Sequence, residues 1–132
     1  MGKHSRNKGA TGEREFIQLV QQLTGGQIKL RRNLDQCRSG GDDCLGHDRF
    51  SIEVKRWKRF TDKDVTQCWH QTSDNAAQQD KLPVLAWRPD FQCWRIMMHP
   101  QVYFPLEDVR GCLSMDIELF CYFLTHPEAL KV

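Results

Sequence analysis

The chain has 132 residues, 39% of them hydrophobic, which fits one compact domain with its own core and excludes two. No apolar run is long enough to cross a bilayer, and the polar, basic first residues carry no apolar signal segment, so we expect an intracellular protein. The six cysteines form no C-x-x-C pair, which predicts reduced thiols rather than a disulfide framework.

The net charge of +2 conceals an uneven distribution along the sequence. Residues 1 to 60 hold 13 Lys and Arg against 7 Asp and Glu, whereas residues 61 to 132 hold 6 against 10. A basic half is typical of polyanion binders, because cations near phosphates release condensed counterions. The alternative is an ordinary solvated charged surface. The candidate polyanion contacts are Lys3, Arg6, Lys8, Arg38, Arg56 and Lys58.

The first clear element is an amphipathic helix over residues 11 to 23. Apolar side chains recur there at helical spacing, Thr11 is the expected N-cap, and two glycines follow soon after Leu23. The residues before it are polar and basic, and we expect them to form a flexible arm. The expected division of the chain is an arm (1–10) and a single domain (11–132) with a core (about 11–98) and a C-terminal extension (99–132).

One acid of this helix occupies an unusual position. Glu13 falls within the stripe of Phe16, Val20 and Leu23, whereas Glu15 lies about 100° from the centre of the stripe. A carboxylate on a buried stripe is unfavourable unless a cation or a metal pairs with it. Glu13 therefore either faces such a partner or sits in the first turn because the helix dipole favours acids there.

A mixed pattern of strands and one further helix follows. Turn-forming glycines separate three short strand candidates, for which an antiparallel meander is the simplest connection. Thr61 is expected to cap a helix, and two apolar runs after it are typical of a hairpin. The expected elements are strands over 27–32, 42–46 and 49–57, a helix from about 62 to 79, and strands over 82–88 and 92–98.

The C-terminal extension predicts one more helix, over residues 114 to 124. Ser114 can cap it, and Leu119 and Phe123 widen its apolar face beyond one stripe. Such a face needs a second surface to cover it, which predicts a homodimer. The alternative is that the helix lies across the sheet of its own chain. The inner stripe consists of Ile117, Phe120, Cys121 and Leu124.

The strand over 49–57 carries an acid and a base inside its apolar part. Because side chains alternate along a strand, Glu53 and Lys55 point together to one face of the sheet. The glycine-rich turn before Asp43 lets the backbone approach this strand closely, so Asp43 and Glu53 can meet. Two carboxylates are hard oxygen ligands suited to Mg²⁺, and an adjacent ammonium can orient a water. This chemistry is typical of phosphodiester hydrolysis.

The motifs KGATGERE, RSGGDD and IEVK, in this order and followed by a helix and KLPVLAWR, resemble the PD-(D/E)XK nuclease superfamily. Within it, the chain is most similar to archaeal Holliday-junction resolvases and small phage-type endonucleases. The resemblance covers about residues 8 to 98. It implies an α/β fold with a restriction-endonuclease-like core, in which helices flank a central mixed sheet in the order α-β-β-β-α-β-β, here with a C-terminal helix added.

The resemblance also implies roles for particular residues. Glu13 matches the acid of the first helix, Glu53 and Lys55 match the acid and lysine of the E-x-K strand, and Asp43 matches the metal-binding aspartate. Asp42 stands where the family often has proline or a hydrophobic residue. The choice between Asp42 and Asp43 therefore stays open, with Asp43 preferred because the apolar segment begins directly after it. Implied catalytic residues are Glu13, Asp43, Glu53 and Lys55, with Asp43, Glu53 and Glu13 as metal ligands.

Two further groups of side chains have alternative interpretations. Gln71 resembles the glutamine that some members place beside the site, but exposed helix glutamines are common. Trp57 and Trp69 lie among cations and either stack on exposed bases or form part of the core.

The sequence therefore predicts an Mg²⁺-dependent endodeoxyribonuclease, with Mn²⁺ able to substitute and no organic cofactor. Its partner is DNA in branched form, as in Holliday-junction resolution, and its place is the cytoplasm of a bacterial or phage-infected cell, with no membrane association. The alternatives are a repair or restriction-type endonuclease without junction selectivity, or an inert DNA-binding module. Lys3, Arg6, Lys8, Arg38, Arg56, Lys58 and Gln71 are the expected DNA contacts.

Overall fold

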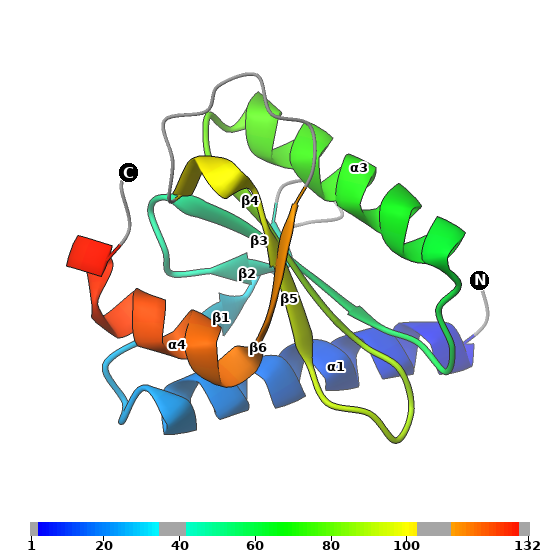
Figure 1. The fold of residues 1–132 in the computed structure, drawn as a ribbon. Helices are drawn as coiled ribbons and strands as arrows, with labels where there is room; N and C mark the ends of the chain where they lie inside the picture. Colours follow the sequence, from blue (N-terminus) through cyan, green and yellow to red (C-terminus); the bar gives the residue numbers. More distant parts are fainter. Residues whose placement is uncertain (1–2, 35–41, 103–111, 130–132) are drawn as a thin grey trace.

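The computed structural model describes residues 3 to 34, 42 to 102 and 112 to 129, with the side chains of residues 3 to 8 left out of the description. One six-stranded mixed sheet has its strands in the order in which they occur along the chain, and helices cover both of its faces (Figure 1). The predicted α/β class is confirmed. The main elements are α1 (Lys3–Leu23), β1 (Arg31–Arg32), β2 (Cys44–Leu45), β3 (Phe50–Arg56), α3 (Asp62–Gln78), β4 (Leu82–Arg88), β5 (Arg95–Met98), β6 (Leu113–Asp116) and α4 (Ile117–Thr125).

The centre of the sheet is the parallel pair β3 and β4, and all other neighbouring strands are antiparallel. Parallel strands need a crossover, which α3 supplies. Thr61 caps α3 in a capping box with Asp64, as predicted. In the parallel register Glu53 lies opposite Leu85 and Lys55 lies opposite Trp87. These four side chains therefore share the face of the sheet that α3 covers.

The sheet separates two apolar clusters. On one face, α1 and α4 contribute Phe16, Val20 and Phe120 to a large core that includes Ile52 and Val54 of β3. On the other face α3 covers a smaller cluster (Figure 1). A strand that is buried on both faces reads as a nearly continuous apolar run. The acid within β3 is therefore enclosed by protein. The smaller cluster consists of Cys68, Trp69, Leu85 and Met97.

The first helix begins earlier than its sequence pattern predicts. It starts at Lys3, so residues 3 to 10 are helical and Thr11 lies inside the helix rather than at its N-cap. The expected arm over residues 1 to 10 is therefore helical from Lys3 onward, and its flexibility stays a prediction. The stripe of apolar residues that fixed the predicted start marks only where α1 meets the sheet, because a helix can continue beyond its buried part.

The C-terminal extension also differs from its prediction. Residues 113 to 116 form β6, which pairs with β5, and α4 follows directly. The N-cap of α4 is Asp116, whose Oδ1 accepts a hydrogen bond of 2.8 Å from the backbone N–H of Leu119, so Ser114 is not the cap. The sequence pattern did not reveal β6, because this short strand is followed directly by the helical apolar stripe of α4. The predicted inner stripe of α4 is buried against its own sheet.

Three of the five described cysteines are buried, Cys93 is exposed, and all five are free thiols. This agrees with the predicted absence of a disulfide framework among the described residues. In the described ranges, no helix combines the length and apolar character that a bilayer crossing requires.

Candidate active site

Asp43 and Glu53 meet at the centre of the sheet. The backbone N–H of Asp43 donates to the carbonyl of Ile52 at 3.0 Å, and Asp43 Oδ2 accepts from the N–H of Val54 at 2.7 Å. These two bonds place Asp43 beside Glu53, and the two carboxyl groups lie within hydrogen-bonding reach of each other. Asp43 is 7% exposed and Glu53 is 4% exposed, so water screens this pair poorly.

The neighbouring aspartate belongs to a different network. Asp42 is 1% exposed, accepts a hydrogen bond of 2.9 Å from Ser51 Oγ, and forms an ion pair of 3.4 Å with Lys81. The geometry thus separates two adjacent acids that the sequence left as alternatives. Asp43 is the one that lies with Glu53, and Asp42 is neutralised by Lys81.

Burial, and after it the charge of Asp43, raises the pKa of Glu53 to about 8. A hydrogen bond of 2.8 Å from Asn75 Nδ2 and the charge of Lys55 oppose these effects. At neutral pH the pair therefore retains a proton unless a cation replaces it. This is the electrostatic environment expected where two carboxylates share one site.

Glu13 approaches the same centre from α1. A Cβ atom at Gly12 would overlap the side chain of Arg56, so only glycine lets α1 come this close to β3. Burial raises the pKa of Glu13, the hydrogen bond from Arg32 lowers it, and the charge of Asp43 raises it. The Arg32 guanidinium donates to Glu13 at 2.8 Å. The inward orientation predicted from the helical stripe is thus observed, and the cation partner is Arg32.

Two side chains at this centre were not predicted. Arg32 holds Glu13, and Asn75 holds Glu53. The predicted glutamine, Gln71, lies exposed on α3 one helical turn before Asn75. Asn75 lies four residues after Gln71, so the helical period could have identified it as a further polar residue on the same side of α3. Arg32 could not be found in this way, because its contact joins α1 to an edge strand.

The donor set fits a hard divalent cation. Both carboxylates are buried, their charges repel, and their oxygens are the ligands that Mg²⁺ prefers. Within the described residues no three His, Cys, Asp or Glu side chains cluster closely enough to hold one ion. Asp43 and Glu53 could serve as direct ligands, since Mg²⁺ commonly takes one or two carboxylates and keeps several waters. For Glu13 to coordinate directly, its ion pair with Arg32 must open.

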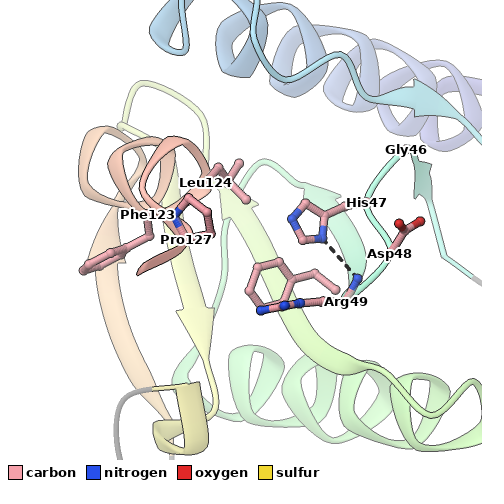
Figure 2. Close-up of a pocket in the computed structure, with 8 residues that line it drawn as sticks. Gly46, His47, Asp48, Arg49, Phe123, Leu124 and Pro127 are labelled. Carbon is pink, nitrogen blue, oxygen red and sulfur yellow. Dashed lines mark hydrogen bonds between the residues drawn. The ribbon is translucent and has the colours of Figure 1, made fainter. Parts of the chain in front are cut away.

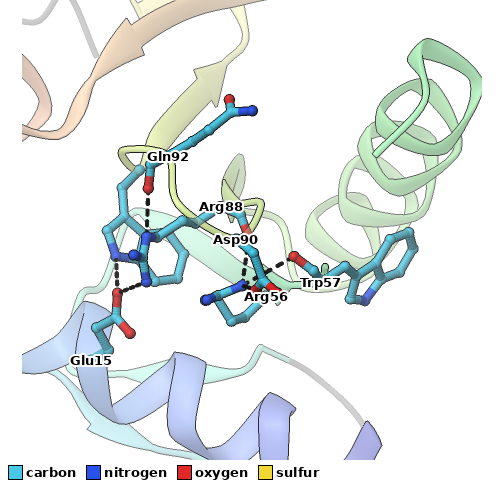
Figure 3. Close-up of polar contacts among 7 residues, drawn as sticks. Glu15, Arg56, Trp57, Arg88, Asp90 and Gln92 are labelled. Atoms are coloured by element: carbon cyan, nitrogen blue, oxygen red, sulfur yellow. Dashed lines mark hydrogen bonds and ion pairs between the residues drawn. The ribbon is translucent and has the colours of Figure 1, made fainter. Parts of the chain in front are cut away.

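One predicted contact of the basic half, Arg56, has intramolecular partners. Arg56 Nη1 lies 2.5 Å from Asp90 Oδ1 and also donates to the carbonyl of Trp57 (Figure 3). Lys58 is exposed beyond the end of β3. Arg38 and the side chains of Lys3, Arg6 and Lys8 lie outside the described part of the structure. The position of Lys58 suits a ligand contact, whereas Arg56 joins the end of β3 to the β4–β5 loop.

A pocket of about 320 Å³ lies away from the carboxylates, between the β2–β3 turn and the end of α4 (Figure 2). His47 lines it, stacks on Phe50 with ring centroids 4.6 Å apart, and accepts a hydrogen bond of 3.2 Å from the N–H of Arg49. Burial lowers the pKa of His47, so its ring is neutral at pH 7. Among the described residues, Asp48 is the only acid that lines this pocket, which makes the pocket a poorer candidate than the centre at Asp43 and Glu53.

Comparison with known structures finds a similarity to Hjc, a Holliday junction resolvase of the archaeal hyperthermophile Archaeoglobus fulgidus. The two chains are 17% identical, with 89% of this chain and 88% of that chain covered, and a TM-score of 0.47. No protein-family model and no curated protein matches the chain.

Glu53 makes the stability of the metal-free protein depend on pH. Its folded-state pKa of about 8 lies above the ordinary 4.5, so the folded state binds this proton more tightly. The resulting stabilisation is complete below pH 4.5 and disappears as the pH rises through 8. Glutamine at this position cannot titrate. We therefore expect the free energy of unfolding of Glu53→Gln, relative to that of wild type, to be higher at pH 9 than at pH 4.5 by roughly 2 to 5 kcal/mol.

Urea denaturation from pH 4.5 to 9 with a chelator present measures this difference. Asp42→Asn serves as a control that alters a buried acid outside the pair. Wild-type and Glu53→Gln curves that run parallel over the whole range would contradict the shared-proton arrangement.

Proposed function

We propose that this protein is a metal-dependent endonuclease that hydrolyses phosphodiester bonds of DNA. The observation that carries the proposal is the arrangement of Asp43, Glu53 and Lys55 around one point of the sheet. Both carboxylates are buried, and Lys55 lies two residues after Glu53 on the same face of β3. A fold needs no repulsive acid pair at its centre, whereas a cation site does.

Each side chain has a defined task in this chemistry. A bound Mg²⁺ or Mn²⁺ would supply Lewis-acid stabilisation of the phosphoryl oxygens and acidify a water. Asp43 and Glu53 would hold it, and Asn75 fixes the orientation of the Glu53 carboxylate. Lys55 would orient the attacking water and balance negative charge on the phosphoryl group. Water adds to phosphorus, one P–O bond breaks, and the leaving sugar oxygen takes up a proton.

DNA is the substrate class that the charge distribution favours. The basic half of the sequence includes β3, and Lys58 and Arg59 are exposed just beyond the end of this strand. Contacts of this kind position a backbone without reading its sequence. We infer selectivity for branched DNA, as in junction resolution, with Mn²⁺ substituting for Mg²⁺. Cleavage of linear and four-way DNA at equal rates would indicate the repair or restriction-type alternative.

Asp42 and Asp43 are adjacent buried acids, so their substitutions form a matched pair for a test of cleavage. Asp43→Asn, Glu53→Gln and Lys55→Ala should each lower Mg²⁺-dependent cleavage of four-way DNA at least ~100-fold, because each removes a group that acts on the reacting phosphate. DNA binding measured in Ca²⁺ should persist, since loss of a carboxylate reduces repulsion of phosphate. Asp42→Asn should keep most of the activity, with folding checked by circular dichroism.

Full activity of Asp43→Asn, or loss of activity in Asp42→Asn alone, would overturn the assignment. Binding of DNA by the wild type without cleavage in any divalent metal would favour the inert binding module instead.

We also propose that the protein acts as a homodimer through the outer face of α4. The inner stripe of α4 is used by its own sheet, but Leu119 is 44% exposed and Tyr122 is 52% exposed. A second copy is the occupant that the chemistry favours, because cutting two strands of a branched DNA needs two centres related by symmetry.

Light scattering at micromolar concentration tests this assembly. We expect twice the monomer mass for the wild type and the monomer mass for Leu119→Glu combined with Tyr122→Glu. Phe120 is unsuitable for substitution because it is fully buried, whereas Phe91→Glu on the β4–β5 loop is a control that should stay dimeric. A monomeric wild type would reject the dimer.

A further inference from the structure

An aromatic pocket of about 450 Å³ lies beyond the end of β3, between the β3–α3 and β4–β5 loops. Phe60 and Trp87 line it and meet edge to face, with ring centroids 5.0 Å apart. Trp57 stacks on Phe60 with nearly parallel rings whose centroids are 4.7 Å apart, and 39% of its surface is exposed. Lys58 and Arg59 also line the pocket and are exposed. Aromatic rings beside cations suit a ligand that is both flat and anionic.

Phe91 stands at this pocket in an unusual conformation. Its side chain is 100% exposed and its φ is +63°, a left-handed backbone conformation that bulky residues rarely adopt. An aromatic ring held fully in water with a strained backbone gives nothing to the core. A binding partner that covers the ring would bury its apolar surface and offset the cost of this conformation.

The loop that carries Phe91 is anchored on both sides. Asp90 pairs with Arg56 and donates its N–H to the carbonyl of Lys58 at 3.1 Å. Arg88 donates to the carbonyl of Gln92 at 2.6 Å and to Glu15 of α1 at 2.6 Å (Figure 3). These bonds join the two walls of the pocket and hold the loop in place. The exposed ring is therefore presented by a fixed support, which lowers the entropy lost on binding.

Trp87 connects this pocket to the candidate active site. It lies opposite Lys55 in the parallel register of β3 and β4, and neighbouring strands are only about 4.8 Å apart. Among the described residues, its Nε1 is the only buried side-chain nitrogen or oxygen without a hydrogen-bond partner. A buried donor without a partner is destabilising unless a ligand engages it. A buried donor without a protein partner thus belongs to a residue that lines the pocket beside the proposed catalytic lysine.

We propose that this pocket binds an unpaired nucleotide of the DNA substrate, adjacent to the phosphate that is cleaved. The base stacks on the rings of Phe91 and Trp57, and Lys58 and Arg59 contact the flanking phosphates. Small movement of Phe60 gives an acceptor of the base access to Trp87 Nε1. The inference rests on the proposed action on DNA and adds a source of selectivity for DNA with unpaired nucleotides over fully paired duplex.

Binding is measured with a chelator present, so that the result does not depend on cleavage. The probes are a fluorescein-labelled ten-nucleotide oligothymidylate, a fully paired duplex, and a gapped duplex with 2-aminopurine at the unpaired position. Phe91→Ala and Trp57→Ala should weaken binding of the oligothymidylate and the gapped duplex about tenfold or more, and binding of the duplex less than about twofold. Leu23→Ala is the control, an exposed apolar residue at the end of α1 and away from the proposed sites.

Trp87→Phe separates ligand binding from a structural role. It removes the N–H and part of the ring but keeps an aromatic side chain, so a purely structural tryptophan predicts a change in stability with DNA binding unchanged. The proposal predicts weaker binding of the unpaired probes by a protein whose fold is retained, as checked by circular dichroism. Unchanged affinity for both unpaired probes in Phe91→Ala, Trp57→Ala and Trp87→Phe would overturn it. Selective binding that these variants lose, in a protein that cleaves no DNA, would support the pocket and reject only the nuclease function.

Discussion

The arrangement of the molecule depends on two carboxylates buried side by side at the centre of a sheet. Asp43 and Glu53 repel each other where water cannot screen them, and the raised pKa of Glu53 reflects this repulsion together with burial. The surrounding structure accommodates the pair rather than avoiding it. β3 supplies a backbone N–H to Asp43, α3 supplies Asn75 to Glu53, and Lys55 adds a positive charge nearby.

The same constraint accounts for the position of α1. Close approach at Gly12 brings Glu13 into the field of Asp43, and Arg32 then neutralises Glu13. Asp42 and Glu13 are ion-paired with Lys81 and Arg32, and Lys55 partly compensates the charge of Glu53. The closely placed carboxylates of Asp43 and Glu53 are the natural place for a divalent cation.

Much of this arrangement was predictable because it follows from short-range rules. The period of a strand put Glu53 and Lys55 on one face, the helical stripe turned Glu13 inward, and the capping box fixed the start of α3. The candidate centre at Asp43, Glu53 and Lys55 emerged from these patterns. Catalytic roles for these residues stay a prediction until cleavage is measured.

The rest required tertiary information. Ion pairs such as Arg56 with Asp90 join residues far apart in sequence, so a run of cations does not show which of them face a ligand. The start of α1 and the strand β6 were missed because a helix extends past its buried stripe and a short strand merges with the helix that follows it. The role of Asn75 depends on how α3 lies across the sheet, which its own sequence does not specify.

The pocket at Phe60 and Trp87 continues the same surface beyond Lys55. Buried charge, half-buried ammonium and exposed aromatic rings follow one another along the α3 face of β3 and its neighbouring loops. In the proposed account, each region meets a different part of one nucleotide. The carboxylates act on the phosphate, the exposed cations contact the backbone, and the rings contact the base.

Calorimetric titration of Mn²⁺ into the metal-free protein at pH 7, in two buffers of different ionisation enthalpy, tests the central claim most directly. Because the pair retains a proton near neutrality, binding of one ion should release about one proton. Glu53→Gln and Asp43→Asn should abolish this binding, whereas Asp42→Asn should retain it. Binding that releases no proton, or that survives unchanged in both Glu53→Gln and Asp43→Asn, would contradict the account.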